Sequence, residues 1–263
     1  MKKYLSIMSA NIKQNMQSLS NIIISIVGNA FIMFVLISLW TYMYEGEDPV
    51  INGYTVTMTT WYVVVGESIQ KLLSGSELVG GINDDIRLGS IAYKINKPYF
   101  YPLYILFNFL GRVVSKFVPQ VIFATIFGYL LIGKLETFKP QFIPFMIIPV
   151  VLSVLIHSFI KMTIGTLAFW VEDSFPFTWI YEKMLLVFGA CFPLDMFPKS
   201  VQNIVGLTPV YGVIYGPARL IIDFSWTQFS QIVLSQVFWV IVTMLICFSV
   251  YKRGARNVNV NGG

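Results

Sequence analysis

A few ionisable side chains interrupt otherwise apolar stretches of this sequence, and they are its first candidates for chemistry. Glu67 and Lys71 are one helical turn apart, and His157, the chain's single histidine, precedes Lys161 by four residues. An ionisable side chain in an apolar segment usually faces a partner or water, because lipid solvates it poorly. Glu67 and His157 are therefore candidates to line a pathway. The alternative is that Glu67 pairs with Lys71 and that His157 makes a polar contact inside a helix bundle.

Enzymatic chemistry has little support in the sequence. A single histidine excludes His-pair metal sites, and no serine elbow or acidic metal cluster is present. Residues 128–135, GYLLIGKL, have the Gly and Lys spacing of a Walker A loop, but Leu135 stands where Ser or Thr would bind magnesium. We predict no catalytic residue, no metal site and no ATP hydrolysis on this chain.

The composition indicates an integral membrane protein. Of the 263 residues, 56% are hydrophobic and only 12% are charged, whereas soluble domains carry about 25% charged residues. Mean hydropathy is +0.70. The net charge of +5 does not form a nucleic-acid-binding patch, because Lys and Arg fall at the ends of apolar blocks. That placement is typical of basic residues on the cytoplasmic side of a membrane.

The elements that must position these residues are apolar blocks separated by polar turns. Leu5, Met8, Ile12, Met16 and Leu19 recur at steps of three and four, which predicts an amphipathic, interfacial helix over residues 3–20. Residues 101–116 are mixed in character and are interpreted as an interfacial lead-in to the next span. The acidic turn Glu45, Glu47 and Asp48 is expected outside, and both termini are expected in the cytoplasm. Six transmembrane spans are predicted at about 22–44, 54–73, 117–133, 142–170, 176–192 and 228–250.

The stretch from 188 to 222 is apolar enough for a membrane but carries Pro193, Pro198, Pro209 and Pro217. Prolines at this density forbid one straight helix. Backbone groups freed by such breaks must find partners within the protein, so the segment cannot face acyl chains. We predict a re-entrant segment before the last span. The expected fold class is an all-α integral membrane protein with one domain, residues 1–263.

Three segments, in order, carry a resemblance to a known family. The first is DDIRLGSIAYKINKP, with Ile86, Gly89, Ile91, Ile95, Lys97 and Pro98 in the family's "I-x-x-G-x-I … L-x-K-P" pattern. The second is IGTLAFWVEDS at 164–174, and the third is the proline-rich stretch with Gly189, Leu194 and Phe197. Together they resemble the permeases of ABC-2 type ABC transporters, especially bacterial viologen and multidrug exporters. Ile95 and Thr208 replace two leucines of these patterns, and neither change removes the feature.

This resemblance implies a six-span permease with a cytoplasmic coupling helix between spans two and three. It implies an ATPase partner in two copies, which would bind ATP and Mg. It further implies a second permease, either another copy or a paralogue, and a bacterial inner (plasma) membrane location. Within the loop 82–98, the residues expected to couple to the ATPase are Asp84, Asp85, Ile86, Arg87, Gly89, Ile91, Ile95, Lys97 and Pro98. Ile86, Leu88, Ile91 and Ile95 are spaced for docking into a groove on that partner.

The same resemblance suggests an external gate shaped by the four prolines and by the aromatic residues Phe197, Tyr211 and Tyr215. Two other functions stay open at this point. An autonomous secondary transporter or channel would explain Glu67 and the broken segment. A non-transporting immunity subunit would bind a peptide at the membrane without moving it.

Overall fold

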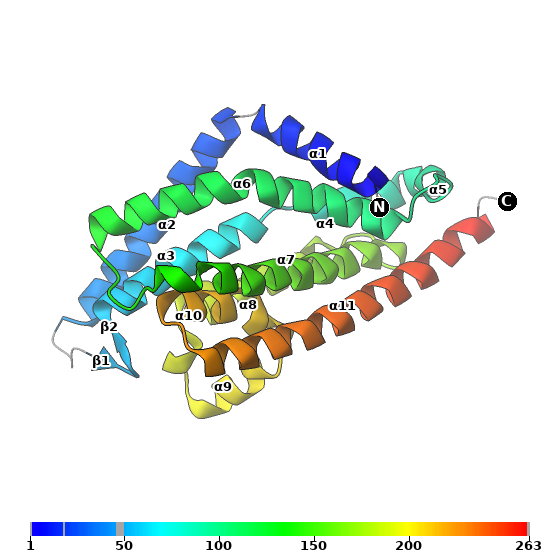
Figure 1. The fold of residues 1–263 in the computed structure, drawn as a ribbon. Helices are drawn as coiled ribbons and strands as arrows, with labels where there is room; N and C mark the ends of the chain where they lie inside the picture. Colours follow the sequence, from blue (N-terminus) through cyan, green and yellow to red (C-terminus); the bar gives the residue numbers. More distant parts are fainter. Residues whose placement is uncertain (1, 18, 46–49, 262–263) are drawn as a thin grey trace.

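Helices make up nearly all of the computed structural model, which describes residues 2–17, 19–45 and 50–261. Long helices run side by side along one axis, with shorter elements at both ends (Figure 1). The elements of the first half are α1 (Lys2–Met16), α2 (Leu19–Met43), β1 (Val50–Ile51), β2 (Tyr54–Thr55), α3 (Val56–Leu73), α4 (Glu77–Arg87), α5 (Ser90–Ile95) and α6 (Tyr101–Leu131). β1 and β2 form a short antiparallel hairpin.

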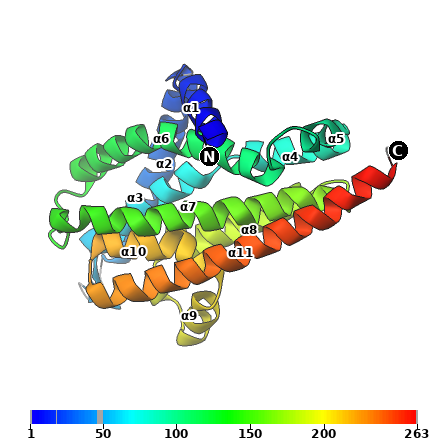
Figure 2. The same cartoon turned by 45° about the vertical axis from the view of Figure 1, so that its right-hand side comes forward.

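The second half contains α7, α8 and α11 together with several short and irregular helices. Its elements are η1 (Pro140–Phe142), α7 (Ile143–Thr166), η2 (Leu167–Phe169), α8 (Phe175–Leu185), η3 (Leu186–Cys191), η4 (Leu194–Met196), α9 (Lys199–Gly206), η5 (Tyr211–Tyr215), α10 (Gly216–Ile222) and α11 (Trp226–Asn261). Of these, η3 and η5 are π-helical. In both views α7 and α11 lie alongside each other (Figure 2).

Four helices of the described chain are long and apolar enough to cross a membrane. Their apolar parts cover Ile24–Met43, Tyr101–Leu131, Pro140–Phe169 and Trp226–Arg256, with mean hydropathies of 2.0, 1.5, 2.3 and 2.3. A fifth candidate is the pair formed by α9 and the helix Tyr211–Ile222, which is bent by 86°. The predicted spans at 54–73 and 176–192 coincide with α3 and with α8–η3. Neither segment is both long and apolar enough to count among these candidate spans. These two spans therefore stay predictions.

The structure changes the expected third span. Residues 101–116 and 117–133 do not form a lead-in followed by a span, because α6 is one continuous helix of 31 residues. Its polar side chains contact other helices: Asn108 accepts a hydrogen bond from Asn11, and Arg112 forms an ion pair with Glu77. Pro119 lies inside α6 without ending it, which is common in membrane helices.

The separate N-terminal helix expected at 3–20 is present as α1, which packs lengthwise on α6. Gly111 of α6 allows this close approach, because a Cβ there would lie 2.7 Å from the Met8 carbonyl oxygen. The first turn of α1 and the last turns of α11 lie at the end of the molecule that carries α5 (Figure 1). Of the acidic turn expected outside, Glu47 and Asp48 lie beyond the described residues.

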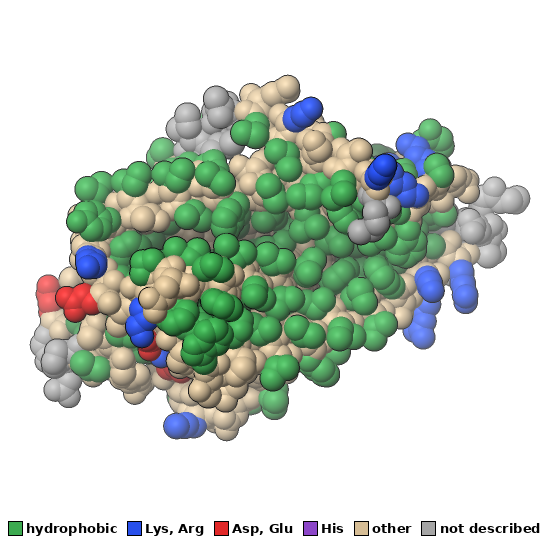
Figure 3. All heavy atoms as spheres, in the orientation of Figure 1, with side chains coloured by type: hydrophobic (Ala, Val, Ile, Leu, Met, Phe, Trp, Pro, Cys, Tyr) green, Lys and Arg blue, Asp and Glu red, His purple; other side chains and the backbone are tan. Residues whose placement is uncertain are grey.

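Apolar side chains cover the middle of the surface seen in Figure 3, and charged side chains gather at its two ends. Exposed apolar residues of α2, α6 and α11 include Phe31, Ile126 and Ile241. An apolar band between two polar ends matches a protein whose middle lies in lipid. The band indicates which two ends of the bundle are in contact with water.

Candidate coupling and gating sites

The first candidate site is an elbow formed by α4, α5 and the following turn, residues 77–98. Helix α4 ends at Arg87, the N–H of the capping residue Leu88 donates to the Asp84 carbonyl, and Gly89 then adopts φ = 72°. A residue with a Cβ is strained at this φ, which explains a glycine at the bend. Helix α5 starts at the next residue and ends before Lys97–Pro98, so the chain turns sharply at the extremity of the molecule (Figure 2).

One carboxylate fastens the elbow. Asp85 accepts hydrogen bonds from Lys94 Nζ at 2.5 Å, Ser90 Oγ at 2.9 Å and Tyr101 OH at 2.7 Å. These donors come from α5 and from the first residue of α6, so a single side chain of α4 joins all three helices. Asp85, predicted as a coupling residue, is thus a bracing residue within the chain. Carboxylates with several donors of this kind are strongly held.

The apolar side chains of the elbow differ in how far they are exposed. Ile91 is only 1% exposed, and Ile86 and Ile95 pack against the same core. Ile91 therefore does not lie on the outer surface of the elbow in this conformation, and its role in coupling to an ATPase stays a prediction. The physical reason is that α5 folds back on α4 at Gly89, which turns Ile91 inward. Leu88 and Tyr93 carry the exposed apolar surface instead, at 80% and 69% exposure.

The remaining elbow residues fall into two groups. Asp84, Arg87, Gly89 and Pro98 are exposed, and Lys97 places its ammonium 4.6 Å from the ring centre of Tyr93. The Pro98 carbonyl accepts a hydrogen bond from Lys3 of α1. The elbow is also tied to α7, because a Cβ on Gly165 would lie 3.0 Å from Ile82 of α4. The elbow is thus in contact with α1, α6 and α7.

The second candidate site lies at the opposite end of the bundle, where the proline-rich segment is broken as predicted. Pro193 separates η3 from η4, Pro198 precedes α9, and Pro209 lies between α9 and η5. Pro217 falls in the first turn of α10, where its missing N–H costs little. The chain bends by 86° between α9 and the helix Tyr211–Ile222.

A cluster around Asp195 holds this broken segment to the β1–β2 hairpin. Asp195 Oδ2 accepts hydrogen bonds from Tyr54 OH at 2.5 Å and from Tyr215 OH at 2.8 Å. Arg219 Nε lies 3.8 Å from the same oxygen, and its guanidinium lies 5.2 Å from the Tyr54 ring centre. The cluster therefore connects the hairpin, η4 and α10 through one carboxylate.

The predicted gate aromatics lie around this cluster. Tyr215 belongs to it, and Tyr211 packs beside Tyr215 with ring centres 5.1 Å apart. Phe197 instead packs against Phe188 and Phe192, at 5.4 Å and 6.0 Å. The structure thus brings the two tyrosines to the Asp195 cluster and places Phe197 in a neighbouring apolar group.

Glu67 and His157 are both buried in the bundle. Glu67 is 4% exposed, forms no ion pair among the described residues, and leaves its Oε1 atom without a hydrogen-bond partner there. The ion pair with Lys71, the alternative to a pathway-lining role for Glu67, is therefore not formed among the described residues. His157 Nδ1 lies 3.2 Å from Tyr181 OH, and Lys161 forms an ion pair with Glu182 at 2.5 Å. The bundle-contact interpretation of His157 accordingly has direct geometric support.

Sequence reasoning missed Asp195, Tyr54, Arg219 and Glu182. Asp195 is the one acidic residue between 188 and 222, which is a signal that could have identified it. Tyr54 carries no comparable signal, because it lies 141 positions from Asp195 in the sequence. Arg219 carries none either, because the broken helical segment lies between it and Asp195. Within the described ranges no three His, Cys, Asp or Glu side chains are grouped so as to hold a metal ion.

In a comparison with protein families, the chain matches the family model described as "ABC-2 family transporter protein" over residues 27–262. No curated protein matches the chain. The matched range begins within α2 and includes the elbow, the broken segment and the Asp195 cluster.

Proposed function

The chain belongs to the ABC-2 family of transporter proteins, and on that premise we propose that it is the permease subunit of an ATP-driven exporter in a bacterial plasma membrane. In this proposal the chain forms part of the translocation path. A separate ATPase subunit, present in two copies, binds ATP and Mg and hydrolyses the ATP. A second permease, identical or paralogous, completes the path.

The observation that carries the proposal is the exposed tip of the elbow. Leu88 and Tyr93 present apolar surface at the bend, and Arg87 and Asp84 flank them with charge. A short helical element with apolar anchors suits a hydrophobic groove on a soluble partner. The tip lies at the end of the bundle that also carries the first turn of α1 and the end of α11 (Figure 1), the end expected in the cytoplasm.

The contacts of the elbow supply a route by which docking would affect the bundle. Asp85 and Ile91 hold α5 to α4 and α6, and Ile82 packs α4 closely against Gly165 of α7. When the ATPases approach each other, the elbows would move with them and tilt α6 and α7. Substrate is transported only if it prefers one of the two resulting states.

In this transport cycle, the Asp195 cluster would hold the path closed at its outer end. Opening the path at that end separates the hairpin from the broken segment, so the bonds from Tyr54 and Tyr215 to Asp195 would break. The cluster is small and polar, and water can replace its hydrogen bonds. It therefore suits a contact that opens and recloses in every cycle.

Substitution of Leu88 tests the docking role. We expect Leu88→Asp to abolish transport and substrate-stimulated ATP hydrolysis in the assembled complex, while leaving the amount of permease in the membrane unchanged. Leu207→Asp is the matched control, because Leu207 is 79% exposed but lies at the other end of the molecule. Full transport by the Leu88→Asp variant would contradict the docking role.

A second candidate function, a secondary transporter driven by a cation gradient, is favoured by Glu67. Its buried carboxyl without a hydrogen-bond partner among the described residues could take up a proton or a cation. Dissipating the ion gradients separates the two functions: flux that stops while ATP is still present favours the gradient-driven transporter. An immunity subunit would instead bind its peptide and show no ATP-driven flux.

A further inference from the structure

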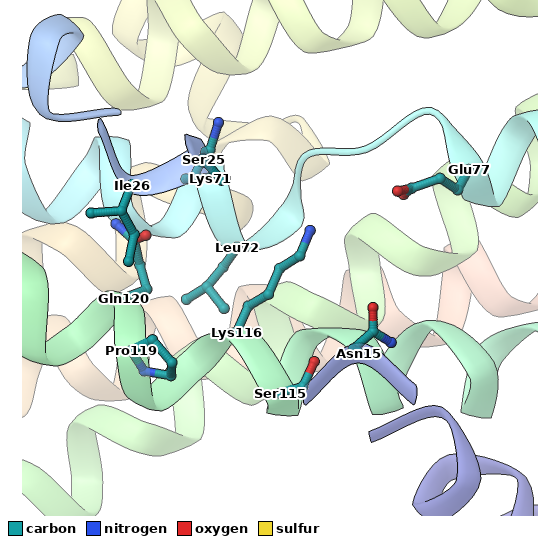
Figure 4. Close-up of a pocket in the computed structure, with 10 residues that line it drawn as sticks. All are labelled: Asn15, Ser25, Ile26, Lys71, Leu72, Glu77, Ser115, Lys116, Pro119 and Gln120. Atoms are coloured by element: carbon teal, nitrogen blue, oxygen red, sulfur yellow. The ribbon is translucent and has the colours of Figure 1, made fainter. Parts of the chain in front are cut away.

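A cavity of about 320 Å³ lies between the ends of α1 and α3, the start of α2 and the middle of α6. Lys71 of α3 and Lys116 of α6 line it, together with Glu77, Asn15, Ser25 and Gln120. In Figure 4 the Lys116 side chain extends from α6 into the space between the end of α3 and Glu77. Neither the elbow tip nor the Asp195 cluster contributes to this cavity.

The charges of the cavity are unbalanced. Lys71 and Lys116 form no ion pair with any described residue, and Glu77, the acidic side chain of the wall, is already paired with Arg112. The two lysines of the wall are therefore not neutralised by its one carboxylate, which leaves the cavity with an excess of positive charge. Two lysines facing the same cavity favour a bound anion, since each repels the other until a negative group lies between them.

A buried donor also lacks a partner here. Gln120 is 5% exposed, and its Nε2 atom has no hydrogen-bond partner among the described residues. A buried amide N–H without an acceptor is costly, so a ligand that brings oxygen acceptors would stabilise it. Ammonium groups and an amide donor together suit a phosphate, whose oxygens accept several hydrogen bonds.

The position of the cavity favours a phosphate carried by a lipid. Ser25 lies at the start of the apolar stretch Ile24–Met43, which is the depth at which headgroups meet acyl chains. Exposed apolar side chains flank its rim on both helices: Ile24 and Val27 of α2, and Val118 and Ile122 of α6. Acyl chains could lie along these side chains while the headgroup enters the cavity.

We propose that this cavity, lined by Lys71, Lys116 and Gln120, binds the phosphate headgroup of an anionic membrane lipid. Its volume is at the lower end of the range of about 300–1,000 Å³ for small-molecule sites, which suits a headgroup and not a whole lipid. Basic cavities between membrane helices at the cytoplasmic surface commonly bind such headgroups. The site goes beyond the export function and does not depend on it.

Native mass spectrometry of the full chain in detergent, titrated with phosphatidylglycerol, tests the proposal. We expect the wild type to bind this lipid at least about 10-fold more tightly than the Lys71→Gln/Lys116→Gln variant, because each lysine near an anionic lipid contributes separately. Lys134→Gln/Lys139→Gln removes the same charge from the loop after α6 and should bind as the wild type does. Equal affinity of the wild type and the Lys71/Lys116 variant would overturn the proposal.

A second measurement needs no variant and distinguishes the source of the phosphate. Labelling of the wild type with an amine-reactive reagent should be slower at Lys71 and Lys116 when phosphatidylglycerol is present, relative to Lys134. Phosphatidylcholine, which is zwitterionic, should protect them less. If inorganic phosphate at millimolar concentration protects both lysines as fully as the lipid does, the site takes a soluble anion and the lipid assignment is wrong. Absence of any protection would overturn the site itself.

Discussion

At the residue scale, the burial of two side chains in the elbow is the opposite of what their residue types suggest. Asp85 looks like a charged surface residue but accepts three hydrogen bonds between helices, whereas Leu88 is apolar yet 80% exposed. Gly89 bends the chain directly after Leu88 through its left-handed φ of 72°, so that α5 folds back on α4 and Leu88 is left exposed at the bend. A helical pattern continued through residues 82–98 therefore assigns Ile91 to the wrong face.

Ile91 provides a stability prediction. Replacing it with Asp should lower the stability of the protein by about 3 kcal/mol or more, since the change removes a buried side chain and adds a charge in its place. The thermal unfolding midpoint in detergent would report this loss. Leu88→Asp, a control with the same chemical change on the exposed side of the bend, should shift the midpoint little. Similar midpoints for the two variants would contradict the burial of Ile91.

Asp195 provides a second prediction at this scale. Asp195→Ala should destabilise the outer end by about 1–3 kcal/mol, because it leaves the buried hydroxyls of Tyr54 and Tyr215 without their acceptor. Glu172→Gln, which alters an exposed acid at the opposite end, is the control. Hydrogen exchange should become faster in the β1–β2 hairpin of the Asp195 variant alone. An unchanged hairpin would show that the cluster does not hold it.

At the scale of elements, the sequence predicts the helices and helix breaks that depend on a local pattern of residues. The amphipathic repeat of Leu5, Met8 and Ile12 predicted a separate N-terminal helix, and the four prolines predicted a broken segment. No break in the helix marks the boundary expected at 116–117, since α6 continues through it, and the extent of the third span stays a prediction. Polar residues such as Asn108 and Arg112 look unsuited to a continuous membrane helix until α1 and α4 are seen to contact them. Such tertiary contacts leave no periodic signal in one sequence.

The packing of α1 on α6 yields a prediction for an element. Gly111→Leu should displace α1, because the new side chain would collide with the Met8 carbonyl oxygen and with Asn11. Cysteines replacing Asn11 and Asn108, whose side chains are hydrogen-bonded, should be joined by a short bifunctional thiol reagent in the otherwise wild-type chain. The Gly111→Leu substitution should suppress that cross-link. Gly81→Ala, where a Cβ meets nothing within 4 Å, should not.

At the scale of the whole molecule, composition predicted a helical membrane protein, while the count of its spans depends on α3 and α8. Helix α3 contains Glu67 and Lys71, and α8 has only 11 residues before it becomes the π-helix η3. Neither is apolar or long enough to be identified alone. Gly66 of α3 lies so close to Ala190 of η3 that a Cβ would be 3.1 Å away. These two segments therefore pack closely against each other.

Under the proposed orientation, cysteines placed at the two ends of the molecule should differ in their accessibility to a reagent outside the cell. With Cys191 and Cys247 replaced by serine, a cysteine at Leu88 should react with a membrane-impermeant maleimide only after the cells are opened. A cysteine at Ile204, which is 68% exposed at the other end, should react in intact cells. Labelling of both positions in intact cells, or of Leu88 alone, would contradict the proposed orientation.

The central claim is that this permease works with a separate ATPase that docks on the elbow. The most direct test is purification of the tagged chain from its own host in mild detergent, with the co-purifying proteins identified and quantified by mass spectrometry. We predict an ATPase with Walker motifs in near-equal amount, retained by the wild type and by Leu207→Asp but lost from Leu88→Asp. A chain that purifies alone and still moves solute without ATP would contradict the account.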